Sequence, residues 1–256
     1  MRVGERVAHA LAVGRPVLAC ESTIVTHGLP APRNLAVARE AEELVAALGV
    51  VPATVGVLDG EVVVGLTDDE LARLATAPDV VKLSARDLPV AVATGASGGT
   101  TVAATAHLAH RAGIRVFATG GLGGVHRGAA RTFDESADLP ALAALPLVVV
   151  SAGVKSVLDV PATLERLETL GVTVAGYRTH AFPGFYVADS GHRVGQRLES
   201  PEQVAAAWRA ARDLGLPGAL VVANPVPAAE QREPGRDQHG DVPAGQQLRH
   251  RLVARR

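Results

Sequence analysis

The chain has 256 residues, of which 48% are hydrophobic and 3% aromatic, and its formal net charge is −1. This length allows one domain with a sizeable core, and the near-neutral charge excludes a general electrostatic attraction to nucleic acid polymers or membrane surfaces. The single cysteine, Cys20, excludes an internal disulfide framework and a cysteine-rich zinc site, and it fits a reducing cytoplasm.

The N-terminal segment predicts a helix, a strand and a polar segment, in that order. Charges interrupt the first twenty residues, so we expect neither a signal peptide nor a membrane span. Residues 3–13 can form a short amphipathic helix, and residues 16–20 are an apolar run of strand length. Glu21 and the six residues after it place a carboxylate, three hydroxyls and an imidazole directly after that strand. They indicate either a functional site or a polar turn, and both remain open at this point.

Regular elements with clear boundaries follow. Apolar residues recur at helical spacing over residues 32–48, and residues 52–66 form two valine-rich runs around Asp59-Gly60, which is typical of a hairpin turn. Thr67 and Glu70 have the spacing of a capping box, which predicts a helix that continues through Leu74.

Lysine is rare in this chain, since Lys82 and Lys155 are its only two lysines against 23 arginines. An amine can lose its proton and attack a carbonyl carbon, whereas a guanidinium stays protonated. Lys82 lies on a short predicted strand, within residues 80–83, and it could serve a substrate or simply pair with Asp87. Chance retention of two surface lysines is the plain alternative for both.

A segment rich in glycine and hydroxyl groups, residues 94–101, precedes an alanine-rich helix that ends at Gly113. Such a loop at a helix N-terminus can bind phosphate through backbone N–H groups without positive charge. It matches neither the P-loop nor the dinucleotide motif.

The strand predicted at residues 114–120 leads into a second glycine-rich segment, residues 121–128. Asp134, Ser136 and Asp138 follow it. These side chains could hold a divalent cation through water or could only begin a short helix toward residue 145. The residues alone leave both interpretations open.

Lys155 follows a buried strand at residues 147–150 and the turn at Gly153, and a helix is predicted over residues 156–171. We therefore expect Lys155 near the carboxyl edge of a sheet, where open α/β sheets bind ligands.

Beyond this point the pattern predicts a strand at 172–177, a helix at 200–214 and a strand at 218–224. The aromatic segment 182–186 could wall an apolar pocket or only pack a loop. Residues 228–256 lack a sustained apolar pattern and are expected to be a disordered tail after a domain of residues 1–227.

Several long segments resemble, in the same order, the pseudouridine-5'-phosphate glycosidase family, also called indigoidine-synthase-A-like. They are ESTIVTHGLPAPRN, VPATVGVLDG, KLSARDL, SGGTTVAATAHLAHRAGIRVFATGGLGGVHRG, TFDESADL, SAGVKSVLDVPATLERLETLGVTVAGYRT and VANPVP. The resemblance implies a three-layer α/β/α fold with a central, largely parallel or mixed sheet, a homotrimer, and a divalent cation, typically Mn²⁺. It also implies an enzyme that reversibly cleaves the C–C glycosidic bond of pseudouridine 5'-phosphate, giving uracil and ribose 5-phosphate.

The family's functional residues match positions of this chain one by one. The resemblance implies that Lys155 is the nucleophile, that Glu21 transfers protons and that Asp134 is the metal ligand. The implied substrate-binding residues are Lys82, Val102, Ser136, Ala137 and Asp138. His126 and Asn224 also lie in matching motifs.

The chemistry of the bond explains why a lysine is needed. A C–C glycoside has no heteroatom leaving group, so the paired-carboxylate mechanism of ordinary glycosidases is insufficient. An amine that adds at C1' can open the ribose and form an iminium, and cleavage then requires a proton at uracil C5. Lys82 and the segment 97–101 are expected to restrain the phosphate.

Residues after 227 depart from the family, which continues there with a further helical region, so the ending resembles a frameshifted or truncated one. Ser151 also stands where the family often has cysteine. Two alternatives therefore stay open: another Schiff-base lyase or aldolase acting on a sugar phosphate, and an inactive remnant that still binds sugar phosphate.

Overall fold

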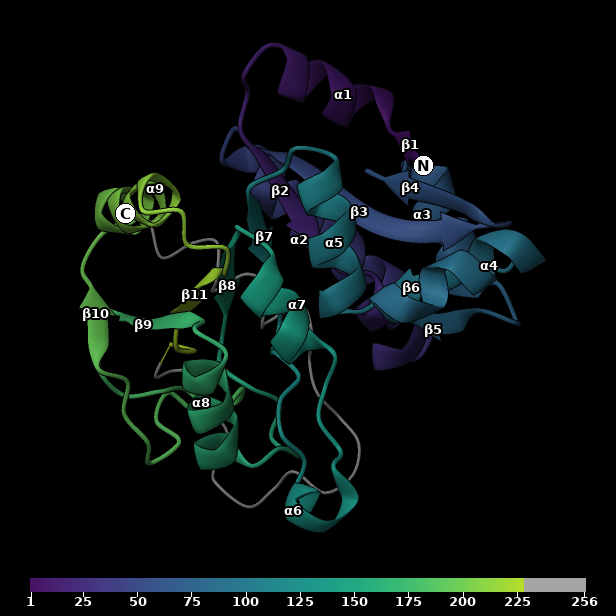
Figure 1. Ribbon diagram of the computed structural model, residues 1–256. Helices are drawn as coiled ribbons and strands as arrows, with labels where there is room; N and C mark the ends of the chain where they lie inside the picture. The colour runs from purple at the N-terminus through teal and green to yellow at the C-terminus, as the bar shows by residue number, and fades with distance from the viewer. Residues whose placement is uncertain (228–256) are drawn as a thin grey trace. The chain divides into compact units, whose positions relative to one another are not determined.

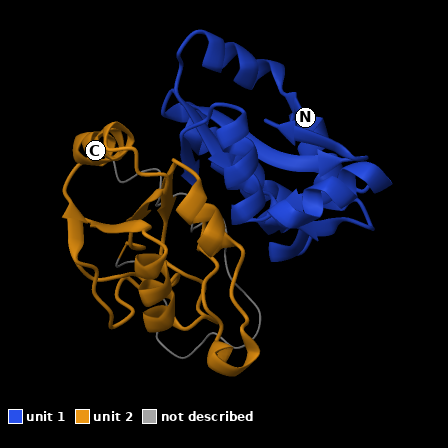
Figure 2. Ribbon diagram, viewed as in Figure 1, with its two compact units in different colours: residues 1–118, 244–256 blue, residues 119–243 orange. Residues whose placement is uncertain are grey.

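The computed structural model describes residues 1–227. The chain forms two compact units, and unit 1 ends at Ala118 while unit 2 begins at Thr119 (Figure 2). The predicted tail, residues 228–256, lies outside the described residues. That residues 1–227 act as one domain stays a prediction.

Unit 1 alternates strands and helices (Figure 1). Its elements are β1 (Arg2–Val3), α1 (Glu5–Ala12), β2 (Val17–Cys20), a π-helical turn (Ile24–Gly28), α2 (Arg33–Ala47), β3 (Val51–Leu58), β4 (Glu61–Val64), α3 (Asp68–Thr76), β5 (Val81–Leu83), a 3₁₀ turn (Ala85–Asp87), α4 (Leu88–Thr94), β6 (Gly98–Thr100), α5 (Val102–Arg111) and β7 (Val116–Ala118).

The sheet of unit 1 is mixed. Strand β2 lies parallel to β3 and to β7, whereas β4 and β6 both pair antiparallel with β3. Strand β1 runs parallel to β4, and β5 runs parallel to β6. Strand β3 is buried along its whole length, so both faces of the sheet are covered there.

Local sequence signals explain several of these elements. The hairpin of β3 and β4 turns at Asp59 and Gly60, whose φ angles of 49° and 78° are those of a primed turn. Helix α3 begins with the predicted capping box of Thr67 and Glu70. One expectation was wrong, because residues 98–100 form strand β6 instead of a loop. The pairing partners of this short strand, β3 and β5, come from distant parts of the chain.

Unit 2 contains the remaining described elements. They are α6 (Ala129–Thr132), α7 (Asp138–Ala144), β8 (Val148–Ser151), α8 (Val160–Thr169), β9 (Thr173–Tyr177), β10 (Gln196–Leu198), α9 (Pro201–Asp213) and β11 (Leu220–Ala223).

The sheet of unit 2 is parallel throughout, in the order β8, β11, β9, β10. Trp208 of α9 packs on a cluster that includes Leu220 and Val222, on one face of β11. Val221 points to the opposite face and is also fully buried. Figure 1 shows α9 and α8 on opposite sides of these strands. The expected α/β fold, with helices on both faces of a sheet, is therefore confirmed.

Among the described residues, no helix combines the length and apolar character that a membrane crossing requires.

Candidate active site

In unit 1, Glu21 follows directly on β2, and the next two residues connect it to β6. The hydroxyl of Ser22 donates to Val55 O at 2.5 Å and accepts from the Thr100 N–H at 2.9 Å. The hydroxyl of Thr23 donates to Thr100 O at 2.9 Å. The hydroxyls that follow Glu21 therefore have a structural task, which is to attach its segment to the glycine-rich segment.

The two glycines of β6 are required by close approach. A Cβ atom at Gly98 would lie 2.4 Å from Leu83 Cδ1, and one at Gly99 would lie 2.2 Å from Thr26 Oγ1. Ser97 directly precedes this strand, and its hydroxyl accepts from the Asp59 N–H at 2.9 Å. Ser97 therefore stabilises the hairpin turn, and its expected contact with phosphate stays a prediction.

Lys82 lies opposite Gly99 in the pairing of β5 with β6, and it is exposed. The interpretation that it pairs with Asp87 is wrong. Asp87 accepts instead from the Ser84 N–H at 2.8 Å and lies 3.5 Å from Arg86 Nε. Within residues 1–227, no side chain forms a salt bridge with the Lys82 ammonium. Its charge is available to an anion beside the glycine-rich segment.

Val102 is the first residue of α5, and its side chain is 1% exposed. The first N–H groups of a helix have no acceptor inside that helix. Val102 can therefore contact a ligand only through its backbone, at the positive end of a helix of ten residues. Unit 1 thus brings Lys82, Val102 and the segment of Glu21 to the same short strand.

In unit 2, the glycine-rich segment 121–128 is hydrogen-bonded on one side to the turn that carries Lys155. The Leu122 N–H donates to Gly153 O at 2.9 Å, and the Lys155 N–H donates back to Leu122 O at 3.1 Å. The backbone of Lys155 is therefore held by Leu122.

The same segment is hydrogen-bonded on its other side to the predicted substrate and metal residues. The Gly123 N–H donates to Asp138 Oδ2 at 2.7 Å, and the Ser136 N–H donates to Gly124 O at 2.9 Å. Ala137 is the cap residue of α7. Unit 2 thus gathers Lys155, Ser136, Ala137 and Asp138 around one glycine-rich segment.

We expected Lys155 immediately before the helix, but it lies five residues before α8, which begins at Val160. Asp159 caps α8 by accepting from the Ala162 N–H at 3.0 Å, so residues 152–159 form a separate turn. Lys155 is half-buried, and its ammonium has no salt-bridge or hydrogen-bond partner among the residues that the structure describes. Within residues 1–227, Lys155 is therefore neither fully exposed nor held in an ion pair.

Asp134 is 63% exposed in its side chain, and its Oδ2 lies 3.8 Å from His126 Nδ1. In the described part of the chain, no three His, Cys, Asp or Glu side chains gather as a metal cage. One exposed carboxylate beside an imidazole fits a hydrated divalent cation that keeps most of its waters, and it does not fit a closed tetrahedral site.

Two further residues contact these turns. The family motif alone indicated Asn224, and the sequence did not indicate Thr163. Asn224 follows β11, and its N–H donates to Ser151 O at 2.8 Å, at the carboxyl end of β8. Thr163, fully buried on α8, accepts from the Val125 N–H at 2.9 Å and so holds the glycine-rich segment. No signal in the sequence distinguishes Thr163 from other helical threonines.

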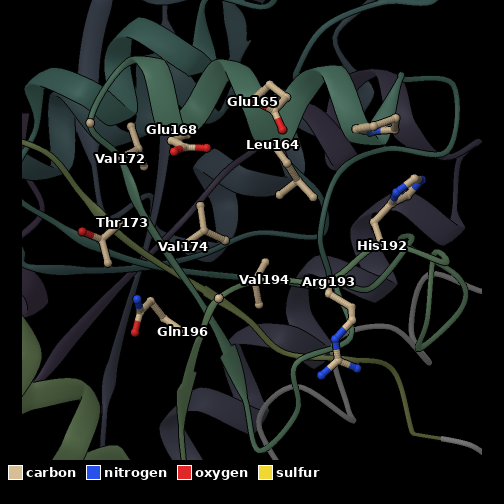
Figure 3. A pocket seen from close by; sticks show the side chains of 13 residues that line it. Leu164, Glu165, Glu168, Val172, Thr173, Val174, His192, Arg193, Val194 and Gln196 are labelled. Carbon is tan, nitrogen blue, oxygen red and sulfur yellow. The ribbon is translucent and has the colours of Figure 1, made fainter.

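Unit 2 also has a hollow of about 620 Å³ between α8, β9 and residues 192–196. Figure 3 shows Glu165 and Glu168 on the helix side, and His192 and Arg193 on the opposite side. None of the predicted site residues lines it, so it is separate from the turn of Lys155.

Comparisons with known proteins agree with the motifs. The model of the family "Indigoidine synthase A like protein" matches residues 6–241. The pseudouridine-5'-phosphate glycosidase of Saccharopolyspora erythraea is 63% identical over 232 residues, which are 91% of this chain and 77% of that protein. The enzyme of the same name from Salinispora tropica is 64% identical over 235 residues, which are 91% of this chain and 72% of that protein.

Two solved structures share the fold. The prealnumycin C-glycosynthase AlnA in complex with ribulose 5-phosphate is 40% identical with a TM-score of 0.85, over 91% of this chain and 76% of that one. An indigoidine synthase A-like protein from Thermotoga maritima is 35% identical with a TM-score of 0.82, over 93% of this chain and 88% of that one. From its motifs, its relatives and its fold, this chain belongs to the indigoidine synthase A-like family.

Proposed function

We propose that this protein is a pseudouridine-5'-phosphate glycosidase, which reversibly cleaves the C–C glycosidic bond of its substrate to give uracil and ribose 5-phosphate. Relatives at 54–64% identity carry that name. The structurally similar C-glycosynthase binds a sugar phosphate, ribulose 5-phosphate. The observation that carries the proposal is the Lys155 ammonium, which has no partner within residues 1–227 and lies on a turn whose backbone is held by Leu122.

In the cleavage direction, the Lys155 amine forms a bond to C1' of the ribose while the C1'–O4' bond breaks and O4' takes a proton. The nitrogen lone pair then drives cleavage of the bond between C1' and uracil C5, and a proton goes to C5. Uracil leaves, and the sugar stays on Lys155 as an iminium. Water hydrolyses the iminium, which releases ribose 5-phosphate and restores the amine. We assign the proton transfers to Glu21.

Binding of the phosphate is assigned to Lys82 and to the first turn of α5, including the Val102 N–H. An ammonium together with backbone N–H groups at a helix N-terminus suits a phosphate dianion. Ser136 and Ala137 are assigned to the sugar. Asp138 is assigned to the same subsite, where its bond to Gly123 makes it a shaping residue as well.

A divalent cation, Mn²⁺ in the first instance, is part of the proposal. Asp134 would hold it, with His126 beside it, and water would complete its shell. When bound, the cation supplies positive charge that can neutralise substrate oxygens. A homotrimer and a cytoplasmic location belong to the proposal too, and the single cysteine supports the latter.

The test follows uracil release from pseudouridine 5'-phosphate in the presence of Mn²⁺. Release of uracil supports the glycosidase, whereas release of an aldehyde or ketone without uracil would indicate the aldolase alternative. Binding of ribose 5-phosphate without turnover would indicate the inactive remnant.

Borohydride trapping with ribose 5-phosphate, followed by peptide mass mapping, tests the nucleophile. We expect an adduct on Lys155 that is absent in Lys155→Arg, because a guanidinium does not form the imine. Lys82→Arg is the matched control and should keep the adduct on Lys155. A stable adduct at any other residue would overturn the assignment.

A further inference from the structure

The aromatic segment 182–186 docks on the turn that carries Lys155. The Phe185 N–H donates to Ala152 O at 2.9 Å, and Gly153 and Gly184 form an antiparallel bridge. A Cβ atom at Gly153 would lie 1.9 Å from Pro183 O, so the two backbones are in direct contact. The position of the segment relative to the turn is therefore set by main-chain packing.

The segment is also held from its other side. Phe182 is fully buried, its N–H donates to His192 O at 2.8 Å, and its carbonyl accepts from the Ser190 hydroxyl at 2.7 Å. Phe185 has a φ of 62°, which a bulky side chain seldom adopts. Contacts on both sides keep it in this conformation.

The ring of Phe185 and the aliphatic part of the Lys155 side chain both lie beside Gly121. A Cβ atom at Gly121 would lie 2.3 Å from Cδ2 and 2.6 Å from Cε2 of Phe185, and 3.5 Å from Cγ of Lys155. Tyr186 packs against the Phe185 ring, with the two ring centroids 4.4 Å apart in an edge-to-face arrangement of 79°. Gly121 thus provides the space in which the ring lies beside the lysine.

We propose that Phe185 is a positioning residue for Lys155: its ring restricts the directions of the lysine side chain and forms the apolar wall beside the amine. A lysine stem is flexible, and restricting it before reaction removes an entropic cost from the reactive encounter. This inference rests on the proposed role of Lys155 as the nucleophile. It goes beyond that role by naming the residue that orients it.

The first experiment compares Phe185→Ala with Phe185→Leu by steady-state kinetics of uracil release and by the rate of borohydride-trapped adduct formation. Phe185→Ala should lower kcat and the adduct rate by about tenfold or more, while KM changes less than about threefold, because orientation and not substrate affinity is lost. Phe185→Leu keeps an apolar side chain and should recover most of both rates. Thermal unfolding of each variant shows that the compared proteins are folded.

The second experiment displaces the ring without removing it. Gly121→Ala places a methyl group where the Phe185 ring lies, so it should slow adduct formation in the wild-type background. In a Phe185→Ala background the ring no longer occupies the space of the methyl group, so Gly121→Ala should slow adduct formation much less.

Two results would overturn the inference, provided that the wild type still forms the adduct on Lys155. One is a wild-type kcat in Phe185→Ala, and the other is that Gly121→Ala slows adduct formation equally with and without Phe185→Ala. Absence of any wild-type adduct on Lys155 would instead overturn the proposed function, and this inference with it. The two failures are thereby distinguished.

Discussion

The backbone N–H of Gly123 donates a 2.7 Å hydrogen bond to Oδ2 of Asp138, which is 4% exposed. A Cβ atom at residue 123 would lie 2.6 Å from the same oxygen and 2.1 Å from Ser136 Oγ, so only glycine fits. Because the neighbouring Leu122 holds the Lys155 backbone, Asp138 shapes the segment on which Lys155 depends.

We expect Asp138→Ala to lower the free energy of unfolding by about 2 kcal/mol, because a buried N–H loses a charged acceptor. Asp138→Asn keeps an oxygen that can accept and should cost less than half of that. Urea denaturation measures both. Equal losses of stability in Asp138→Ala and Asp138→Asn would mean that the negative charge of Asp138 stabilises the fold, and not its hydrogen bond from the Gly123 N–H.

Asp134→Asn should raise the Mn²⁺ concentration needed for half-maximal binding by about tenfold or more, since a carboxylate ligand is replaced by a neutral amide. Stability without metal should change by less than about 0.5 kcal/mol, because Asp134 is exposed. Glu135→Gln is the matched control, because Glu135 is the neighbouring carboxylate and is not assigned to the metal. It accepts instead from Arg166 Nε at 2.9 Å. Manganese titration followed by electron paramagnetic resonance measures both variants, and equal effects would contradict the assignment of Asp134.

The capping box of α3 should give part of the acid sensitivity of unit 1. Burial alone raises the pKa of Glu70, but hydrogen bonds from the Thr67 N–H and from Arg2 outweigh it, and the pKa lies below its ordinary value. This stabilisation is present above the unfolded pKa of about 4.3 and is lost as the pH falls through the lower folded value.

Glu70→Gln keeps a capping side chain but removes the charge, so the loss of stability between about pH 5 and pH 3 should become shallower than in the wild type. Thr67→Ala removes the cap itself and should cost about 1 kcal/mol at neutral pH. Unfolding by urea across this pH range is the measurement. Identical pH slopes for wild type and Glu70→Gln would contradict the role of Glu70.

Cys20 should resist alkylation in the folded protein. Burial, and secondarily the charges of Glu42 and Glu21, raise the pKa of the Cys20 thiol to about 12. The folded thiol therefore stays protonated at pH 8, and stability should decline as the pH rises from about 8.5 toward that value. Iodoacetamide should label the protein slowly at pH 8 and rapidly after unfolding in urea, and rapid labelling of the folded protein would contradict this.

Where the determinants are local, the sequence alone predicted the structure. Asp59 and Gly60 turn the hairpin because two adjacent residues can adopt positive φ, and Thr67 caps α3 because its partner Glu70 is three residues away. The buried valine run at β8 and the periodicity of α2 depend in the same way on neighbouring residues. The motifs around Glu21 and Lys155 further sufficed to recognise the family.

Long-range contacts decided the rest. Strand β6 exists because β3 and β5, from distant parts of the chain, pair with it. Asp87 is a local exception, because it accepts from the Ser84 N–H and lies beside Arg86 instead of pairing with Lys82. The sequence left the segment 182–186 undecided between a wall and a packed loop. The structure places Phe185 beside Gly121 and Lys155, because three segments far apart in the chain meet there through backbone hydrogen bonds and a missing Cβ atom.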